Sequence, residues 1–175
     1  MNILEKEIEE IVFLADNELL SKKGLRLYKN KLSQVNFGDY GIADIITWRV
    51  IKNNSCRTIN FQVVELKKEL IDVNTLMQAS RYATAIREIM SQFNLLNTKI
   101  SIEIVLIGKK VQIIGDFVFL ANFVHNLDIY EYKISLEHGI IFNKQQGWRK
   151  REGFGIMNDF DTFLEQYKNE YYVNS

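Results

Sequence analysis

The sequence contains no proline and a single cysteine, Cys56. One cysteine excludes an internal disulfide framework and is typical of a protein from a reducing compartment. No apolar run reaches the roughly 20 residues needed to span a bilayer, and the first residues do not form the apolar region of a signal peptide. We therefore expect a cytoplasmic protein without a membrane partner, whose turns depend on glycine and asparagine.

The chain also lacks an excess of charge of either sign. Lysine plus arginine and aspartate plus glutamate number 22 each, so the formal net charge is zero. A global basic field, the usual mark of a nucleic-acid-binding protein, is absent. A local patch is sufficient for such binding, and the sequence offers one at Arg149, Lys150 and Arg151. The two histidines, His125 and His138, have no partner at metal-ligand spacing.

Length and pattern predict one domain with an α/β (α+β) fold. The 175 residues, 47% of them hydrophobic, are enough to bury one core. We expect a core over about 2–107 and a C-terminal elaboration over 108–175. Apolar periodicity predicts these elements in order: a helix over 2–16, strands over 24–29, 40–50 and 58–67, a helix over 73–93, a strand over 99–107, a helix over 116–126, a strand pair over 128–143 and a helix over 159–171. The core order is α-β-β-β-α-β, with a mixed sheet because the helix over 73–93 is a crossover.

Two charged residues lie on an apolar face of the strand over 58–67. Period two places Glu65 and Lys67 on the same face as Phe61 and Val63. An ionised group that leaves water needs a partner charge, hydrogen bonds or a metal. This position therefore favours a functional carboxylate rather than a solvated one.

The preceding strand carries a second carboxylate in an apolar row. Alternation groups Asp44 with Ile46 and Trp48, and the polar turn at 52–56 joins the two strands in an antiparallel hairpin. Asp44 and Glu65 can then converge. Two adjacent carboxylates repel each other, and Mg²⁺, which binds through one or two carboxylates, water and phosphate, relieves that repulsion.

The helix over 73–93 adds a polar pair. Gln78 and Tyr82 stand four residues apart, so they reach the same spot, either as a surface pair or as part of a site. The neighbouring Arg81 is either a solvated charge or a phosphate ligand. Asp72 or Asn74 is the expected N-cap.

This ordered set resembles the PD-(D/E)XK nuclease superfamily. Asp44, Glu65-x-Lys67 and Gln78-x-x-x-Tyr82 occur in its order, and the last element is similar to its RecB-type branch. Within that branch, GLRLYKN, GDYGIADIITWR and VVELKKELIDVNTLMQASRYATAIREI look most like the catalytic domain of NucS-type endonucleases. The resemblance covers about residues 4–87. The chain departs from the family name at one position, where alanine replaces the proline before Asp44.

The resemblance implies a restriction-endonuclease-like core and a nuclease dependent on Mg²⁺ or Mn²⁺. Asp44 and Glu65 would bind the metal, Lys67 would act on the attacking water, and Gln78 and Tyr82 would support the site.

The same resemblance implies further partners for the site. An acidic residue of the first helix, Glu7 or Glu10, could join the metal ligands. For a nuclease, the basic residues noted above, Arg81 and the 149–151 cluster, are the candidate ligands of nucleic acid, in the first instance DNA. The protein would act as a homodimer or as a subunit of a larger repair, mobile-element or defence complex. The alternative is a catalytically silent module that binds nucleic acid or protein on the same fold.

Overall fold

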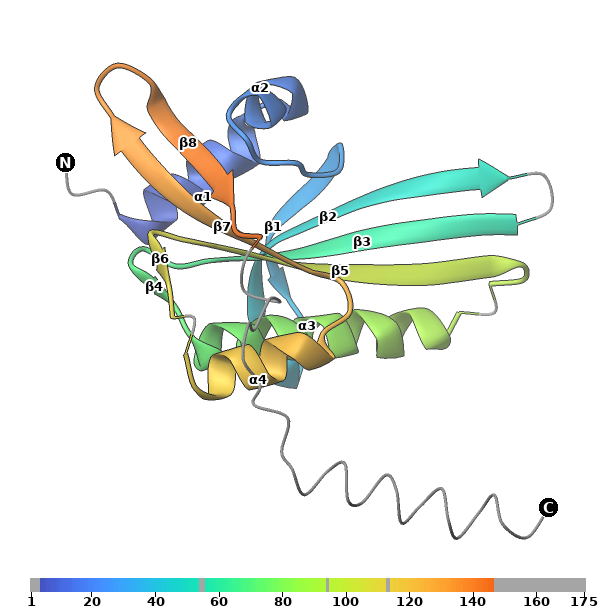
Figure 1. Cartoon of the computed structure of the whole chain (residues 1–175). Helices are drawn as coiled ribbons and strands as arrows, with labels where there is room; N and C mark the ends of the chain where they lie inside the picture. The colour runs from blue at the N-terminus through green and yellow to red at the C-terminus, as the bar shows by residue number, and fades with distance from the viewer. Residues whose placement is uncertain (1–3, 54–55, 94, 113, 147–175) are drawn as a thin grey trace, which may run out of the picture.

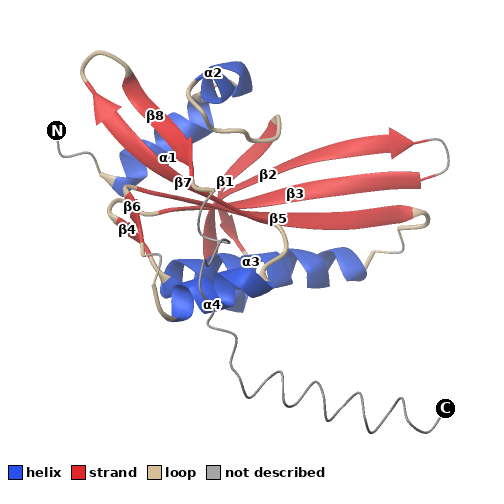
Figure 2. Ribbon diagram, in the orientation of Figure 1, coloured by secondary structure: helices blue, strands red, loops and turns tan. Residues whose placement is uncertain are grey.

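The computed structural model describes residues 4–53, 56–93, 95–112 and 114–146, which form an α+β protein built on a six-stranded mixed sheet (Figures 1 and 2). The elements are α1 (Glu5–Leu14), α2 (Asn17–Lys22), β1 (Asn30–Asn36), a 3-10 turn (Gly38–Tyr40), β2 (Ile42–Asn53), β3 (Cys56–Leu66), β4 (Leu70–Ile71), α3 (Val73–Ser91), β5 (Thr98–Gly108), β6 (Lys110–Val111), α4 (Asp116–Phe123), β7 (Leu127–Ser135) and β8 (Gly139–Lys144).

The sheet has the order β1-β2-β3-β5-β7-β8. β1, β2 and β3 are antiparallel neighbours, whereas β5 lies parallel to β3 and β7 lies parallel to β5. α3 and α4 are the crossover helices of the two parallel connections, and β7 and β8 form an antiparallel hairpin. The predicted mixed sheet, the hairpin of β2 and β3 and the parallel crossover are confirmed. β4 and β6 form a separate two-stranded parallel sheet.

Helices cover both faces of the sheet. Figure 1 shows α3 and α4 on one face and α1 and α2 on the other. The core on the α3 side contains Val63 and Leu106, and the core on the α1 side contains Val64 and Val105. β3 and β5 are therefore buried on both faces in their C-terminal halves. The N-terminal part of β5 and the paired ends of β2 and β3 extend beyond α1 and α2.

The predicted strand over 24–29 is wrong, although its apolar side chains are buried as expected. Leu25 and Leu27 are 0% and 8% exposed. The backbone here bonds to side chains instead of a neighbouring strand: Asn17 Nδ2 donates to Leu27 O, and the Tyr28 amide donates to Gln62 Oε1. Two buried leucines that are two residues apart occur both in strands and in irregular segments such as this one, so their spacing alone could not predict the backbone conformation.

The first strand of the sheet lies further along the chain, at Asn30–Asn36, where the sequence pattern predicted no strand. β1 is an edge strand with most of its residues exposed, so its sequence, NKLSQVN, has no buried face to mark it. The segment between the predicted helix over 2–16 and the predicted strand over 24–29 contains α2, whose N-cap Asp16 accepts a hydrogen bond from the Leu19 amide at 2.7 Å.

The remaining elements follow the prediction closely. α3 begins after the N-cap Asp72, which accepts a hydrogen bond from the Thr75 amide at 2.9 Å. α4 and the β7–β8 hairpin occupy the predicted ranges. The helix predicted over 159–171 lies outside the described residues, and the single-domain assignment stays a prediction.

None of the helices in the described ranges is both long enough and apolar enough to cross a membrane.

Candidate active site

The candidate site lies where β2 and β3 separate. Their pairing runs from Asn53–Cys56 to Ile45–Val64, and Asp44 and Glu65 are the next positions beyond the last pair. Asp44 Oδ2 accepts a hydrogen bond from the Leu66 amide at 2.8 Å. The Asp44 side chain thus holds the end of β3 beyond the last backbone pair between β2 and β3. The two carboxylates meet at this point.

Glu65 is the most buried charged residue of the described chain, at 0% exposure. Its Oε1 accepts a hydrogen bond from Lys67 Nζ at 2.9 Å. Its Oε2 is buried and has no hydrogen-bond partner among the described residues. Leaving a buried acceptor unpaired costs about 1–3 kcal/mol, and more for a charged group. Glu65 therefore has one satisfied oxygen and one buried oxygen whose hydrogen-bonding capacity is unused in the described structure.

Both carboxylates resist ionisation in the isolated protein. Burial raises the pKa of Asp44 to about 6, against the opposing effects of the Leu66 amide and Lys67. Burial, followed by the charge of Asp44, raises the pKa of Glu65 to about 7 in spite of its bond to Lys67. Desolvation dominates in both cases because two charges share a site from which water is largely excluded. A cation between the carboxylates would reverse this effect.

Lys67 has the opposite tendency. Burial lowers its pKa, but its contacts with Glu65, Glu5 and Asp44 together raise the pKa by more, so the net shift is upward. The ammonium therefore stays charged at neutral pH, and it is a donor with no lone pair to offer a metal or a proton.

Of the α1 acids, Glu5 contacts this group, and Glu9 also raises the pKa of Asp44 through its charge; the predicted Glu7 and Glu10 are not among the groups that act on it. Glu5 Oε1 lies 3.9 Å from Lys67 Nζ, and Glu5 Oε2 accepts a hydrogen bond from the Lys68 amide at 2.8 Å. Glu7 bonds to the N-terminal amide of its own helix, and Glu10 is exposed. A sequence signal for Glu5 was present, because it lies three residues before Ile8 and so on the buried stripe of α1.

The Gln78 and Tyr82 pair packs behind the loop that leads to Asp44. Gln78 Nε2 donates to Tyr82 Oη at 2.9 Å, and the Tyr82 ring, 2% exposed, stacks on Phe37 with centroids 6.2 Å apart. A Cβ on Gly41 would lie 3.3 Å from the same ring, and Gly41 has a φ of 103°. Tyr82 therefore supports the loop from inside, and its burial leaves no surface for a nucleic-acid backbone.

Of the predicted nucleic-acid ligands, Arg81 alone lies within the described residues. Arg81 is exposed on α3. Arg149, Lys150 and Arg151 lie outside the described ranges. Their predicted role stays a prediction.

A divalent metal fits the residues that the structure brings together. Asp44 and Glu65 supply two carboxylates, and Glu65 Oε2 supplies a buried acceptor without a partner. Mg²⁺ is commonly held by one or two carboxylates, with water and phosphate in its other positions. In residues 4–53, 56–93, 95–112 and 114–146, no group of three or more His, Cys, Asp or Glu side chains is placed to hold a metal ion.

Comparisons of the chain with protein-family models, curated proteins and solved structures found no match. The chemistry open to the site follows from the side chains described above.

Proposed function

We propose that the protein is a nuclease that hydrolyses phosphodiester bonds of DNA with Mg²⁺ or Mn²⁺, and that Asp44, Glu65 and Lys67 form its active site. The observation that carries the proposal is the buried, unpartnered Oε2 of Glu65, beside Asp44 and within an ion pair to Lys67. A surface ion pair at a strand end would have no reason to bury a carboxylate oxygen without a partner.

The architecture supports the same proposal. The order α-β-β-β-α-β is present if α2 and the two-residue β4 are regarded as insertions. The three antiparallel strands, followed by a helix and a parallel strand, agree with the restriction-endonuclease-like core implied by the resemblance. The proposal therefore includes a restriction-endonuclease-like core, to which the elements after β5 are additions.

The division of labour follows from the ionisation of each group. A bound Mg²⁺ or Mn²⁺ would supply positive charge that activates water and offsets the charge of the scissile phosphate. Asp44, fixed by the Leu66 amide, and Glu65 would hold the metal. Lys67 Nζ stays protonated and donates hydrogen bonds to the attacking water or to a phosphate oxygen. Glu5 and Glu65 hold that ammonium in place.

The test is cleavage of plasmid and labelled oligonucleotides in Mg²⁺, Mn²⁺ or EDTA by the wild type and by Asp44→Ala and Glu65→Ala. We expect metal-dependent cleavage by the wild type and none by either variant. A control with Glu137→Ala, a carboxylate with 83% of its side chain exposed, should cleave normally.

Thermal melts show whether the variants remain folded. Mn²⁺ should raise the melting temperature of the wild type alone, since a ligand at 100 times its Kd stabilises by about 2.7 kcal/mol. Unchanged cleavage by a folded Asp44→Ala or Glu65→Ala protein contradicts the proposal. DNA binding by a wild type that cleaves in no metal would favour the catalytically silent module instead.

A further inference from the structure

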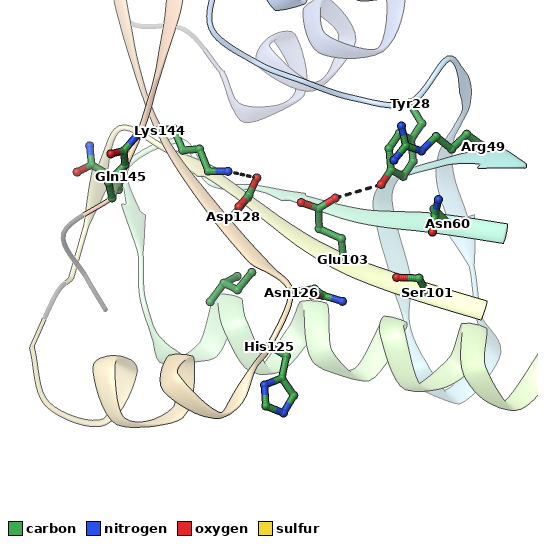
Figure 3. A pocket seen from close by; sticks show the side chains of 12 residues that line it. Tyr28, Arg49, Asn60, Ser101, Glu103, His125, Asn126, Asp128, Lys144 and Gln145 are labelled. Atoms are coloured by element: carbon green, nitrogen blue, oxygen red, sulfur yellow. Dashed lines mark hydrogen bonds and ion pairs between the residues drawn. The ribbon is translucent and has the colours of Figure 1, made fainter. Parts of the chain in front are cut away.

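A second polar site lies on the opposite face of the sheet. A cleft of about 630 Å³ opens between the β7–β8 hairpin and the parts of β2, β3 and β5 that contain Arg49, Asn60 and Glu103 (Figure 3). Its lining includes Tyr28, Arg49, Asn60, Glu103, Asp128 and Lys144. Glu103 shares a strand face with Val105, in the core on the α1 side, whereas Glu65 shares a face with Val63, on the α3 side. The cleft is therefore separate from the candidate active site.

A buried glutamine, Gln62, holds two of the residues that line the cleft, Tyr28 and Glu103. Gln62 is 4% exposed, and its Oε1 accepts hydrogen bonds from the Tyr28 amide at 2.9 Å and from Thr47 Oγ1 at 2.8 Å. Its Nε2 donates to Glu103 Oε2 at 2.9 Å. One side chain thus ties the irregular segment at Tyr28 to β2 and β5. A polar network satisfied in this way makes the cleft rigid and holds its carboxylate in one position.

Two carboxylates present acceptors to the cleft. The hydrogen bonds that Glu103 receives in the described structure, from Gln62 and Tyr28, both end on Oε2, and those that Asp128 receives, from Lys144 and Tyr130, both end on Oδ2. Figure 3 shows the two side chains next to each other. Burial raises the pKa of Glu103, the hydrogen bond from Gln62 opposes this shift, and the Asp128 carboxylate, which lies within hydrogen-bonding reach, raises the pKa further. A ligand with paired N–H donors would satisfy the second oxygens.

A flat cationic surface stands beside these acceptors. The guanidinium carbon of Arg49 lies 4.5 Å from the centroid of the Tyr28 ring, and Arg49 is exposed. Tyr28 covers one face of the guanidinium, and both residues line the cleft. Nucleic-acid bases stack on guanidinium planes of this kind, and a cation in the cleft also attracts phosphate.

We propose that this cleft binds a guanine base carrying a phosphate, with the base stacked on Arg49 and its N–H edge bonded to the adjacent carboxylates of Glu103 and Asp128. Guanine presents two adjacent donors, N1–H and N2–H, which match the second oxygens of these two carboxylates, whereas adenine and cytosine each present a donor beside an acceptor. Donor-to-carboxylate pairing is therefore selective for guanine. The inference rests on the proposed function in taking a nucleotide as the ligand, and it gives that function a second, base-reading contact.

The experiment measures binding by calorimetry in EDTA, so that the metal site and cleavage play no part. The ligands are GMP, AMP, CMP, arginine and a single-stranded oligonucleotide with one guanine among thymines. We expect GMP to bind most tightly of the three mononucleotides. Arginine, which has similar donors and no base to stack, should bind more weakly than GMP.

Two variants test the two contacts. Glu103→Gln replaces an acceptor with a donor and should weaken GMP binding about 5- to 150-fold, the range for one bidentate contact to a base. Arg49→Ala removes an exposed side chain, so the fold should persist, and should weaken binding by a similar factor through the lost stacking. Glu137→Gln, the same chemical change at an exposed position, should bind GMP as the wild type does.

The outcomes distinguish a nucleic-acid strand from a free nucleotide as the ligand, and they distinguish binding in the cleft from binding at the candidate active site. Tighter binding of the oligonucleotide than of GMP identifies a nucleic-acid strand as the source, and equal binding identifies the free nucleotide. Equal affinities for GMP, AMP and arginine, no binding at millimolar GMP, or wild-type affinity in both variants would overturn the proposal. Glu65→Gln should keep GMP affinity, so a failure of the nuclease proposal leaves this test intact.

Discussion

Replacement of Glu65 by glutamine should stabilise the metal-free protein at alkaline pH. In the folded state Glu65 has a pKa of about 7, raised from 4.5 by burial and by Asp44. Because the folded state binds this proton more tightly than the unfolded state, the stability contributed by Glu65 is present below pH 4.5 and is lost as the pH rises to about 7. The change corresponds to about 3 kcal/mol, since one pKa unit is worth about 1.36 kcal/mol.

Urea denaturation in EDTA at pH 4.5 and pH 8 measures the effect. Glutamine resembles the protonated carboxyl and does not ionise, so the variant should unfold with nearly the wild-type free energy at pH 4.5, within about 0.5 kcal/mol. At pH 8 it should be more stable by about 3 kcal/mol. The difference between the two pH values reports the ionisation of Glu65 together with its repulsion by Asp44, because the contributions of titrating groups remote from this pair largely cancel.

The exposed Glu137→Gln variant is the control and should show no such difference. Equal stability of Glu65→Gln and the wild type at both pH values would refute the reasoning. It would mean that Glu65 is solvated or already paired in the metal-free protein. Saturating Mn²⁺ should stabilise the wild type at pH 8 and leave Glu65→Gln almost unchanged.

Two further predictions concern Lys67 and Gly24. Lys67→Met should retain Mn²⁺ affinity by calorimetry while single-turnover cleavage falls about 10²- to 10⁴-fold, and loss of metal affinity or wild-type cleavage would contradict the role of the ammonium. Gly24→Ala should cost more than about 2 kcal/mol of unfolding free energy in urea, because φ is +94° and a Cβ would lie 2.1 Å from the carbonyl oxygen of Phe142. Gly139→Ala, with a φ of +63° and open space around its Cβ, should cost less, and equal losses in the two variants would refute the steric argument.

Charged residues in apolar strands were the most informative signal in the sequence. The alternation of β2 and β3 predicted that Asp44 and Glu65 share a face and meet, and the structure places them together at the end of the paired region. The same signal exists at Glu103, between Ile102 and Ile104, where it marks the second cleft. Strand patterns have this power because burying a carboxylate is costly and so rarely accidental.

Features that depend on tertiary contacts could not be predicted in the same way. β1 is a polar edge strand, and its partner β2 alone defines it. The choice of Glu5 over its neighbours depends on how α1 docks on the sheet. The segment around Leu27 is held by Asn17 and Gln62, residues 10 and 35 positions away in the chain. Each of these contacts joins segments that are distant in the sequence, so neither the local apolar periodicity nor the local composition predicts it.

The parallel pairing of β3 with β5 determines which part of the fold opens least. Amide protons at the centre of a sheet, buried on both faces, exchange with solvent through the largest unfolding events, whereas those of an edge strand exchange through local fraying. Glu65 lies within that slow-exchanging centre, opposite Leu106, and Asp44 lies on the strand next to it. Fraying of β1 and β8 at the two edges should therefore leave the spacing of the two carboxylates unchanged.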